Sequence, residues 1–82
     1  MERDGILIFH SIHRVMRAEK ELKSAGFDVR LLPVPRELSS DCGLSLAFRW
    51  GDWSRVRLAL DVADCSAEQV YQRDGGGYVR VG

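Results

Sequence analysis

The residue best suited to covalent chemistry is Cys42, which lies in the stretch PVPRELSSDCGLSL (residues 33–46). Serines and an aspartate precede it, and Gly43 follows it, which is the composition of a loop rather than of a core. A thiolate is the nucleophilic form of cysteine, and Gly43 allows the backbone a positive φ beside the sulfur. The stretch therefore predicts a thiol that can be reached, with an idle loop cysteine as the alternative.

Charged and polar neighbours would change the reactivity of this thiol. Cationic groups and a helix N-terminus favour the thiolate, and carboxylates oppose it. The candidates on the favourable side are a helix start capped by Ser11 and the side chains of His10, His13 and Arg36. The candidates on the other side are Glu37 and Asp41. The sequence leaves the sign of the net effect open.

His10, His13 and Cys42 together also offer three ligands of the kind that zinc accepts. The HxxH spacing alone is a weak signal, so we expect no metal and no cofactor. A histidine that hydrogen-bonds beside Cys42 is the preferred interpretation. A Cys-His hydrolase is disfavoured because the chain is short and shows no third group to orient the histidine.

Composition excludes several classes of protein. With 82 residues the chain is one domain, and its formal net charge of zero argues against nucleic acid as the main partner. No apolar run approaches the roughly 20 residues that a membrane span needs. The two cysteines form no CxxC and no disulfide framework, and no signal peptide is evident. We therefore expect a cytoplasmic protein whose thiols stay reduced.

Hydrophobic periodicity predicts the order βαββαβ, which is the ferredoxin-like α+β arrangement with two helices on one face of an antiparallel sheet. The expected strands are 5–10, 27–34, 43–50 and 67–73, and the expected helices are 12–25 and a second helix that starts with Asp52 as its cap. Residues 1–4 are a tail, 5–73 the α/β core, and 74–82 a turn followed by a hairpin arm or a flexible tail.

The same patterns predict which side chains are buried and which face solvent. Ile12, Val15 and Met16 are expected in the core. The strand 43–50 alternates, so one of its faces is expected in the core and the other in solvent. Its predicted solvent-facing residues are Ser45, Ala47 and Arg49. Prolines at the end of 27–34 indicate an edge strand.

The topology also predicts which segments share an edge of the sheet. A right-handed crossover makes the first two strands parallel, so the loop carrying Cys42 should lie at the same end as residues 9–13. Cys65, at the end of the second helix, is expected to pack as a small apolar residue. We place it at the opposite end from Cys42, so no disulfide between the two is expected.

Several of these residues form a pattern that resembles the sulfur/selenium carrier protein-like family, over about residues 5–72. The first element of the pattern is Ser11 and His13 at a helix start, with Ala18 and Glu19 inside the helix. The second is Pro33, Pro35 and Arg36, and the third is the turn Ser39, Ser40, Cys42 and Gly43. Asp41 departs from the pattern, since a serine is common at that position.

The resemblance implies that Cys42 accepts sulfur or selenium as a persulfide or perselenide and passes it on. The site would comprise Cys42, Gly43, Arg36, Ser39 and Ser40, supported by His10, Ser11 and His13. The partners would be a donor protein and an acceptor protein. A homodimer is a further option that follows from length, because so short a chain would gain stability by association. Such a carrier is a reagent rather than a turnover enzyme. The alternative is an interaction module without thiol chemistry, which docks a partner or a second copy through its open sheet face.

Overall fold

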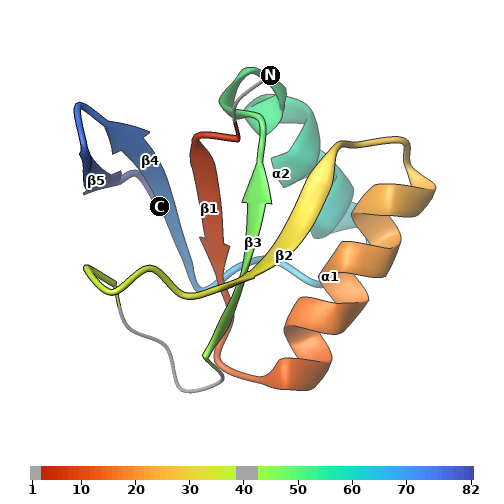
Figure 1. Cartoon of the computed structure of the whole chain (residues 1–82). Coiled ribbons are helices and arrows are strands. Elements are labelled where there is room, and N and C mark those ends of the chain that lie inside the picture. Colours follow the sequence, from red (N-terminus) through yellow and green to blue (C-terminus); the bar gives the residue numbers. More distant parts are fainter. Residues whose placement is uncertain (1–2, 39–42) are drawn as a thin grey trace.

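Strands and helices follow one another in the predicted order, and a further strand ends the chain (Figure 1). The computed structural model describes residues 3–38 and 43–82. Its strands are β1 (Gly5–Ile8), β2 (Val29–Pro33), β3 (Leu44–Phe48), β4 (Gln69–Asp74) and β5 (Gly77–Arg80). Its helices are α1 (Ile12–Ser24) and α2 (Trp53–Val62), and a short 3₁₀ turn, η1 (Trp50–Asp52), precedes α2. None of the helices described is long and apolar enough to cross a membrane.

The strands form one antiparallel sheet in the order β2-β3-β1-β4-β5. Leu7 on β1 stands between Leu46 on β3 and Val70 on β4. β2 lies at an edge of the sheet, as predicted. Pro33 has no backbone N–H to donate, which an edge strand tolerates and an inner strand does not. The ferredoxin-like α+β prediction is confirmed, with β5 added beside β4.

In Figure 1, α2 lies behind the sheet and α1 lies beside β2 at the right, and residues of both helices pack in one cluster against the same face of the sheet. The largest part of the core lies between them and the sheet, built from Leu7, Phe9, Val15, Leu22, Leu46, Phe48, Val56 and Leu60. The prediction for α1 was wrong at Ile12 and Met16, which are 43% and 46% exposed. The helix instead turns Val15, Ala18 and Leu22 to the sheet, and this i, i+3, i+7 stripe leaves those two side chains at its margin.

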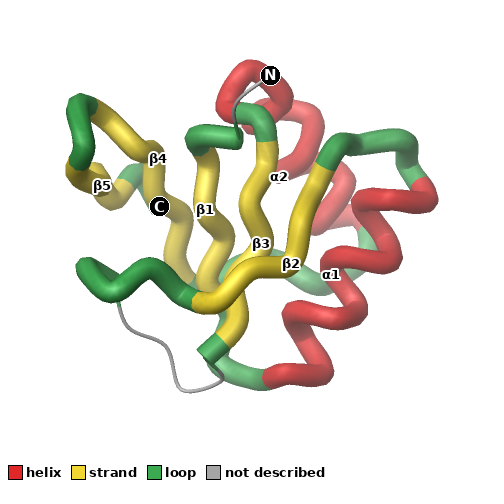
Figure 2. The backbone as a smooth tube through the Cα atoms, in the orientation of Figure 1, coloured by secondary structure: helices red, strands yellow, loops and turns green. Residues whose placement is uncertain are grey.

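The other face of the sheet carries a second, smaller apolar cluster. Ile6, Ile8 and Ala47 are buried there, under Val34 and Leu38 among others. These last two belong to the segment after β2, which crosses the lower end of the sheet (Figure 2). β3 is therefore buried on both faces, and the expectation that Ser45 and Ala47 face solvent was wrong. The hydroxyl of Ser45 donates to the carbonyl of Leu32 at 3.2 Å, which satisfies it in the interior.

The last residues of the chain extend the sheet. β5 pairs with β4 through a turn at Gly75 and Gly76, which have φ values of 60° and 89°. Two successive residues with positive φ are typical of the tight hairpin turn that matches the twist of a sheet. The backbone N–H of Val81 then donates to the carbonyl of Val70 at 2.8 Å. Residues 77–80 are thus the hairpin arm that the sequence allowed.

Candidate functional site

The loop that contains Cys42 begins and ends at the edge of the sheet where α1 starts (Figure 1). Ile8, at the end of β1, pairs with Ser45 near the start of β3. The backbone N–H of Val34 donates to the carbonyl of Gly43 at 3.1 Å. The two flanks of the loop therefore share an edge with the start of α1, as predicted. The predicted site residues Ser39, Ser40 and Cys42, and their neighbour Asp41, lie outside the described residues.

Gly43, which is covalently joined to Cys42, has a backbone conformation that only glycine adopts without strain. Its φ is +73°, and nothing lies within 4 Å of the position that a Cβ would take. The residue is exposed. The glycine is therefore required by the backbone turn and not by crowding. Of the two roles that glycine allows, a positive φ and a close backbone approach, the structure shows the positive φ.

The start of α1 is a capped helix N-terminus. Ser11 is extended, with φ −140° and ψ 145°, and its hydroxyl accepts the backbone N–H of Arg14 at 3.1 Å. The first turn of α1 holds no acidic residue. The positive end of the helix dipole is therefore not neutralised from within the helix.

Glu68, which the sequence reasoning missed, completes this edge. Its Oε2 accepts the backbone N–H of His10 at 3.2 Å, and its Oε1 forms an ion pair with the guanidinium of Arg14. Its side chain is only 20% exposed. No local signal marks this glutamate, because 54 residues separate it from Arg14 and only the pairing of β4 with β1 brings them together.

The two histidines of the predicted site lie near the start of α1. His10 follows β1, His13 stands in the first turn of α1, and both are exposed. Among residues 3–38 and 43–82, no three His, Cys, Asp or Glu side chains form a group that could hold a metal. The predicted ligand set of His10, His13 and Cys42 includes a residue outside those ranges, so a metal site formed by these three stays a hypothesis.

Arg36 lies on the segment that crosses the open face of the sheet. The N–H of Leu38 donates to the carbonyl of Pro35 at 2.9 Å, so Arg36 is carried on a tight turn. Its side chain is exposed, while Val34 and Leu38 on either side pack onto the sheet. Apolar contacts thus anchor the chain that leads into the cysteine loop, and Arg36 itself remains available to solvent or a partner.

Cys65 is a buried cysteine, as predicted. It is 6% exposed, its thiol is free, and it packs in the core between the helices and the sheet. Burial raises the pKa of the Cys65 thiol, and the positive charge of Arg17 offsets part of that rise. The structure therefore gives this residue a packing role and low reactivity.

The predicted location of Cys65 was wrong. α2 runs back from the far end of β3, so its C-terminus returns to the edge where α1 starts. Two contacts across that edge show this: Arg17 donates to the carbonyl of Ala63 at 2.6 Å, and the N–H of Glu68 donates to the carbonyl of Ile8 at 2.9 Å. Cys65 thus lies at the same end of the sheet as the flanks of the Cys42 loop, and the argument from distance against a disulfide does not hold.

The fold and this edge define a class: a small ferredoxin-like α+β domain in which the flanks of a cysteine-containing loop share an edge of the sheet with the start of the first helix. The chain belongs to the family described as "Putative Se/S carrier protein-like", which matches residues 4–72. The resemblance predicted from the sequence is thereby confirmed.

Two curated relatives are similar to the chain. A "Putative sulfur carrier protein" of Aquifex aeolicus (strain VF5) is 36% identical over 77 residues, which are 92% of this chain and 39% of that protein. The "Uncharacterized protein YtiA" of Escherichia coli (strain K12) is 34% identical over 44 residues, 54% of this chain and 52% of that protein. The chain thus spans about half or less of the length of these relatives. No solved structure matches it.

Proposed function

We propose that this domain carries sulfur or selenium on Cys42, as a persulfide or perselenide, between a donor protein and an acceptor protein. Membership of the Se/S carrier protein-like family is the observation that carries the proposal. The Aquifex relative, whose name describes a sulfur carrier, aligns over nearly the whole of this chain.

The transfer step needs only thiol exchange. The thiolate of Cys42 attacks the terminal sulfur of a donor persulfide, R–S–SH. A sulfur–sulfur bond forms on Cys42 as the sulfur–sulfur bond of the donor breaks, which leaves Cys42–S–SH and the donor thiolate R–S⁻. Delivery repeats the exchange with an acceptor thiolate. No oxidant or cofactor is consumed, and the rate depends on the thiolate fraction and on access to the sulfur.

The edge around α1 supports a thiolate on the adjoining loop. The first turn of α1 has no acidic residue and ends on Arg14, although Glu68 neutralises part of that charge. We propose that Ser11 keeps this helix end formed and that His10 and His13 supply hydrogen bonds to the sulfur or its cargo. A helix N-terminus and cationic neighbours both favour a thiolate.

The loop residues have supporting roles in the proposal. Gly43 provides the sharp turn after Cys42, and Ser39 and Ser40 offer hydroxyl groups that can donate to a persulfide anion. Arg36 is the exposed cation on the approach to the loop, suited to a carboxylate of the partner or to the anionic cargo. The proposed compartment is the cytoplasm, where reducing conditions keep such a thiol available.

Sulfur loading followed by intact mass tests the proposal. The chain is incubated with a cysteine desulfurase and cysteine, and then measured without reductant. The Cys65→Ser variant should gain the mass of one sulfur atom, and the Cys42→Ser variant should gain none. With selenocysteine as the substrate, a gain of one selenium atom would extend the cargo to selenium. Equal loading of both variants, or of neither, would reject Cys42 as the carrier thiol.

A further inference from the structure

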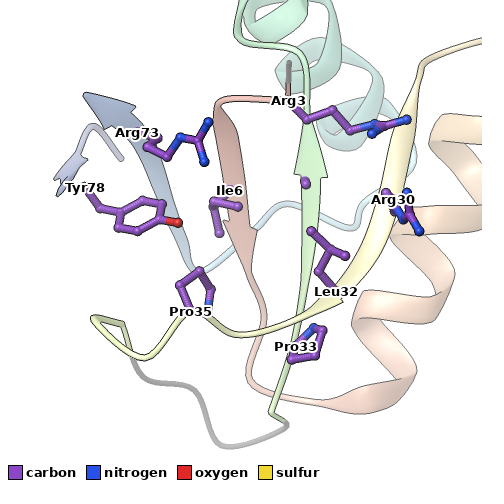
Figure 3. A pocket seen from close by; sticks show the side chains of 9 residues that line it. Arg3, Ile6, Arg30, Leu32, Pro33, Pro35, Arg73 and Tyr78 are labelled. Carbon is purple, nitrogen blue, oxygen red and sulfur yellow. The ribbon is translucent and has the colours of Figure 1, made fainter. Parts of the chain in front are cut away.

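A basic depression lies on the face of the sheet that the helices leave uncovered (Figure 3). Its volume is about 290 Å³. Three arginines, Arg3, Arg30 and Arg73, line it, and no carboxylate does. The aspartates that pair with two of these arginines are not among the lining residues, so the surface that lines the depression is basic.

The three arginines are not equally engaged. Arg3 forms an ion pair with Asp28 at 2.9 Å, and Arg73 forms one with Asp4 at 3.4 Å. Arg30 is exposed and makes no ion pair with a residue of the described ranges. A guanidinium presents several donors in a plane that fits a carboxylate, so Arg30 can bind one without breaking an ion pair of the fold.

The floor of the depression is apolar. Ile6 and Ala47, from the neighbouring strands β1 and β3, lie at its base and are 5% and 2% exposed. Figure 3 shows the side chains of Pro33 and Pro35 along one side and Tyr78 reaching in from β5. Rigid apolar walls above such a floor suit an inserted hydrophobic side chain.

The depression adjoins the chain that leads to the cysteine loop. Pro33 ends β2, and Pro35 opens the turn before residues 39–42. A partner seated against these prolines would therefore contact the described residues that precede the cysteine loop along the chain.

We propose that this depression docks an acidic segment of a partner protein, with an apolar side chain on Ile6 and Ala47 and a flanking carboxylate on Arg30. A free inorganic anion would leave the apolar floor unused, and a purely hydrophobic partner would leave Arg30 without a counter-charge. The inference specifies the partner of the proposed carrier and in that respect rests on the proposed function. Docking itself requires no sulfur.

The test uses the full chain with Cys42→Ser, so that binding is measured without thiol chemistry. The probe is a blocked synthetic peptide in which a pair of leucines is flanked by glutamates, titrated while backbone amide shifts are followed by NMR. One comparison peptide carries glutamines in place of the glutamates, and another carries glycines in place of the leucines. Arg30→Gln is compared with Arg57→Gln, an exposed arginine of α2 that likewise has no ion pair in the described part of the chain.

We expect the acidic leucine peptide to shift the amides of Ile6, Ala47 and Tyr78, and both comparison peptides to bind more weakly. Arg30→Gln should weaken binding by about three- to fivefold, as for one exposed charge pair, and Arg57→Gln should leave it unchanged. Added salt should weaken it further.

The inference is overturned if the peptide shifts only helix residues or none, or if the glutamine peptide binds equally well. It is also overturned if these amides shift with protein concentration alone, since a second copy of the chain would then be the occupant. A failure here with normal sulfur loading of Cys42 would reject the docking face and leave the carrier proposal standing.

Discussion

The carboxylate of Glu68 pairs with the guanidinium of Arg14 and joins the start of β4 to the first turn of α1. The same carboxylate accepts the backbone N–H of His10. One side chain thus holds both the link that leaves β1 and the helix that follows it. The proposed carrier loop has its flanks at this edge, so the position of the helix start relative to Gly43 depends on this contact.

Removing that carboxylate should loosen the edge. Glu68→Ala is expected to lower the free energy of unfolding by about 1 kcal/mol, because it removes a partly exposed ion pair and a charge-assisted hydrogen bond. Urea denaturation measures the change. Glu37→Ala is the matched control, since Glu37 is exposed and has no ion pair in the described part of the chain. Equal stability of the two variants would show that Glu68 does not hold this edge.

Gly5 is the position where the fold tolerates no side chain. A Cβ there would overlap the ring of Phe48, its partner across the sheet, which is fully buried against Trp50 and Trp53. We expect Gly5→Ala to cost about 1–3 kcal/mol of stability through overpacking. Gly51→Ala, where a Cβ meets nothing within 4 Å, should change stability by less than about 0.5 kcal/mol. A thermal melt of both variants decides this, and an unchanged Gly5→Ala would mean that the ring can move aside.

The elements and their order could be predicted because local chemistry determines them. Ser11 caps α1 as predicted, and Gly26, with φ +89°, lies just beyond the end of this helix. The buried residues of α2 are Val56 and Leu60, whose i, i+4 spacing places them on one face of the helix. Once the order was known, the right-handed crossover placed the start of α1 beside the flanks of the cysteine loop.

Two of the failures concern contacts between distant segments. Ser45 is buried because the chain near Val34 and Leu38 covers a face of β3 that alternation alone marks as exposed. Glu68 reaches Arg14 only through strand pairing. Cys65 was predicted at the wrong end of the sheet because the direction in which α2 runs was misjudged. For Ser45 and Glu68, the residue types at the position carry no information about the distant segment that contacts it.

The cap of α1 should contribute measurably to stability. Ser11→Ala removes the acceptor for the N–H of Arg14 and is expected to cost about 1 kcal/mol, while Ser11→Asp keeps an acceptor and should recover most of it. Chemical denaturation of both variants tests this. Ser24→Ala, at the exposed last residue of α1, is the control and should be close to the wild type. A loss as large in Ser11→Asp as in Ser11→Ala would argue against the cap.

Cys65 should be a poor nucleophile in the folded chain. Burial raises its pKa above the ordinary value near 9.0, so the thiolate is scarcer at any given pH than in a free thiol. In the Cys42→Ser variant, alkylation by iodoacetamide should be slow at neutral pH, and its rate should climb with pH beyond the range where a free thiol has levelled off. Unfolding in urea should restore the rate of a free thiol. Rapid alkylation of the native variant would contradict the buried position.

The same shift gives the stability a pH dependence. Because the pKa of Cys65 is raised in the folded state, the stability it contributes is complete below the unfolded pKa and is lost as pH rises toward the folded one. In the Cys42→Ser background, the free energy of unfolding should therefore fall more steeply above about pH 9 with Cys65 than with Cys65→Ala. Equal slopes in urea denaturation would show that the thiol is as easily ionised folded as unfolded.

The central claim is that Cys42 both takes up and gives up sulfur, and a two-step transfer measured by intact mass tests it most directly. The Cys65→Ser chain is loaded by a desulfurase and cysteine, separated from both, and then mixed with an acceptor thiol. The account predicts a gain of one sulfur atom, its loss on contact with the acceptor, and the appearance of a persulfide on the acceptor. A chain that gains no sulfur, or that gains it equally with Cys42→Ser, would contradict the account.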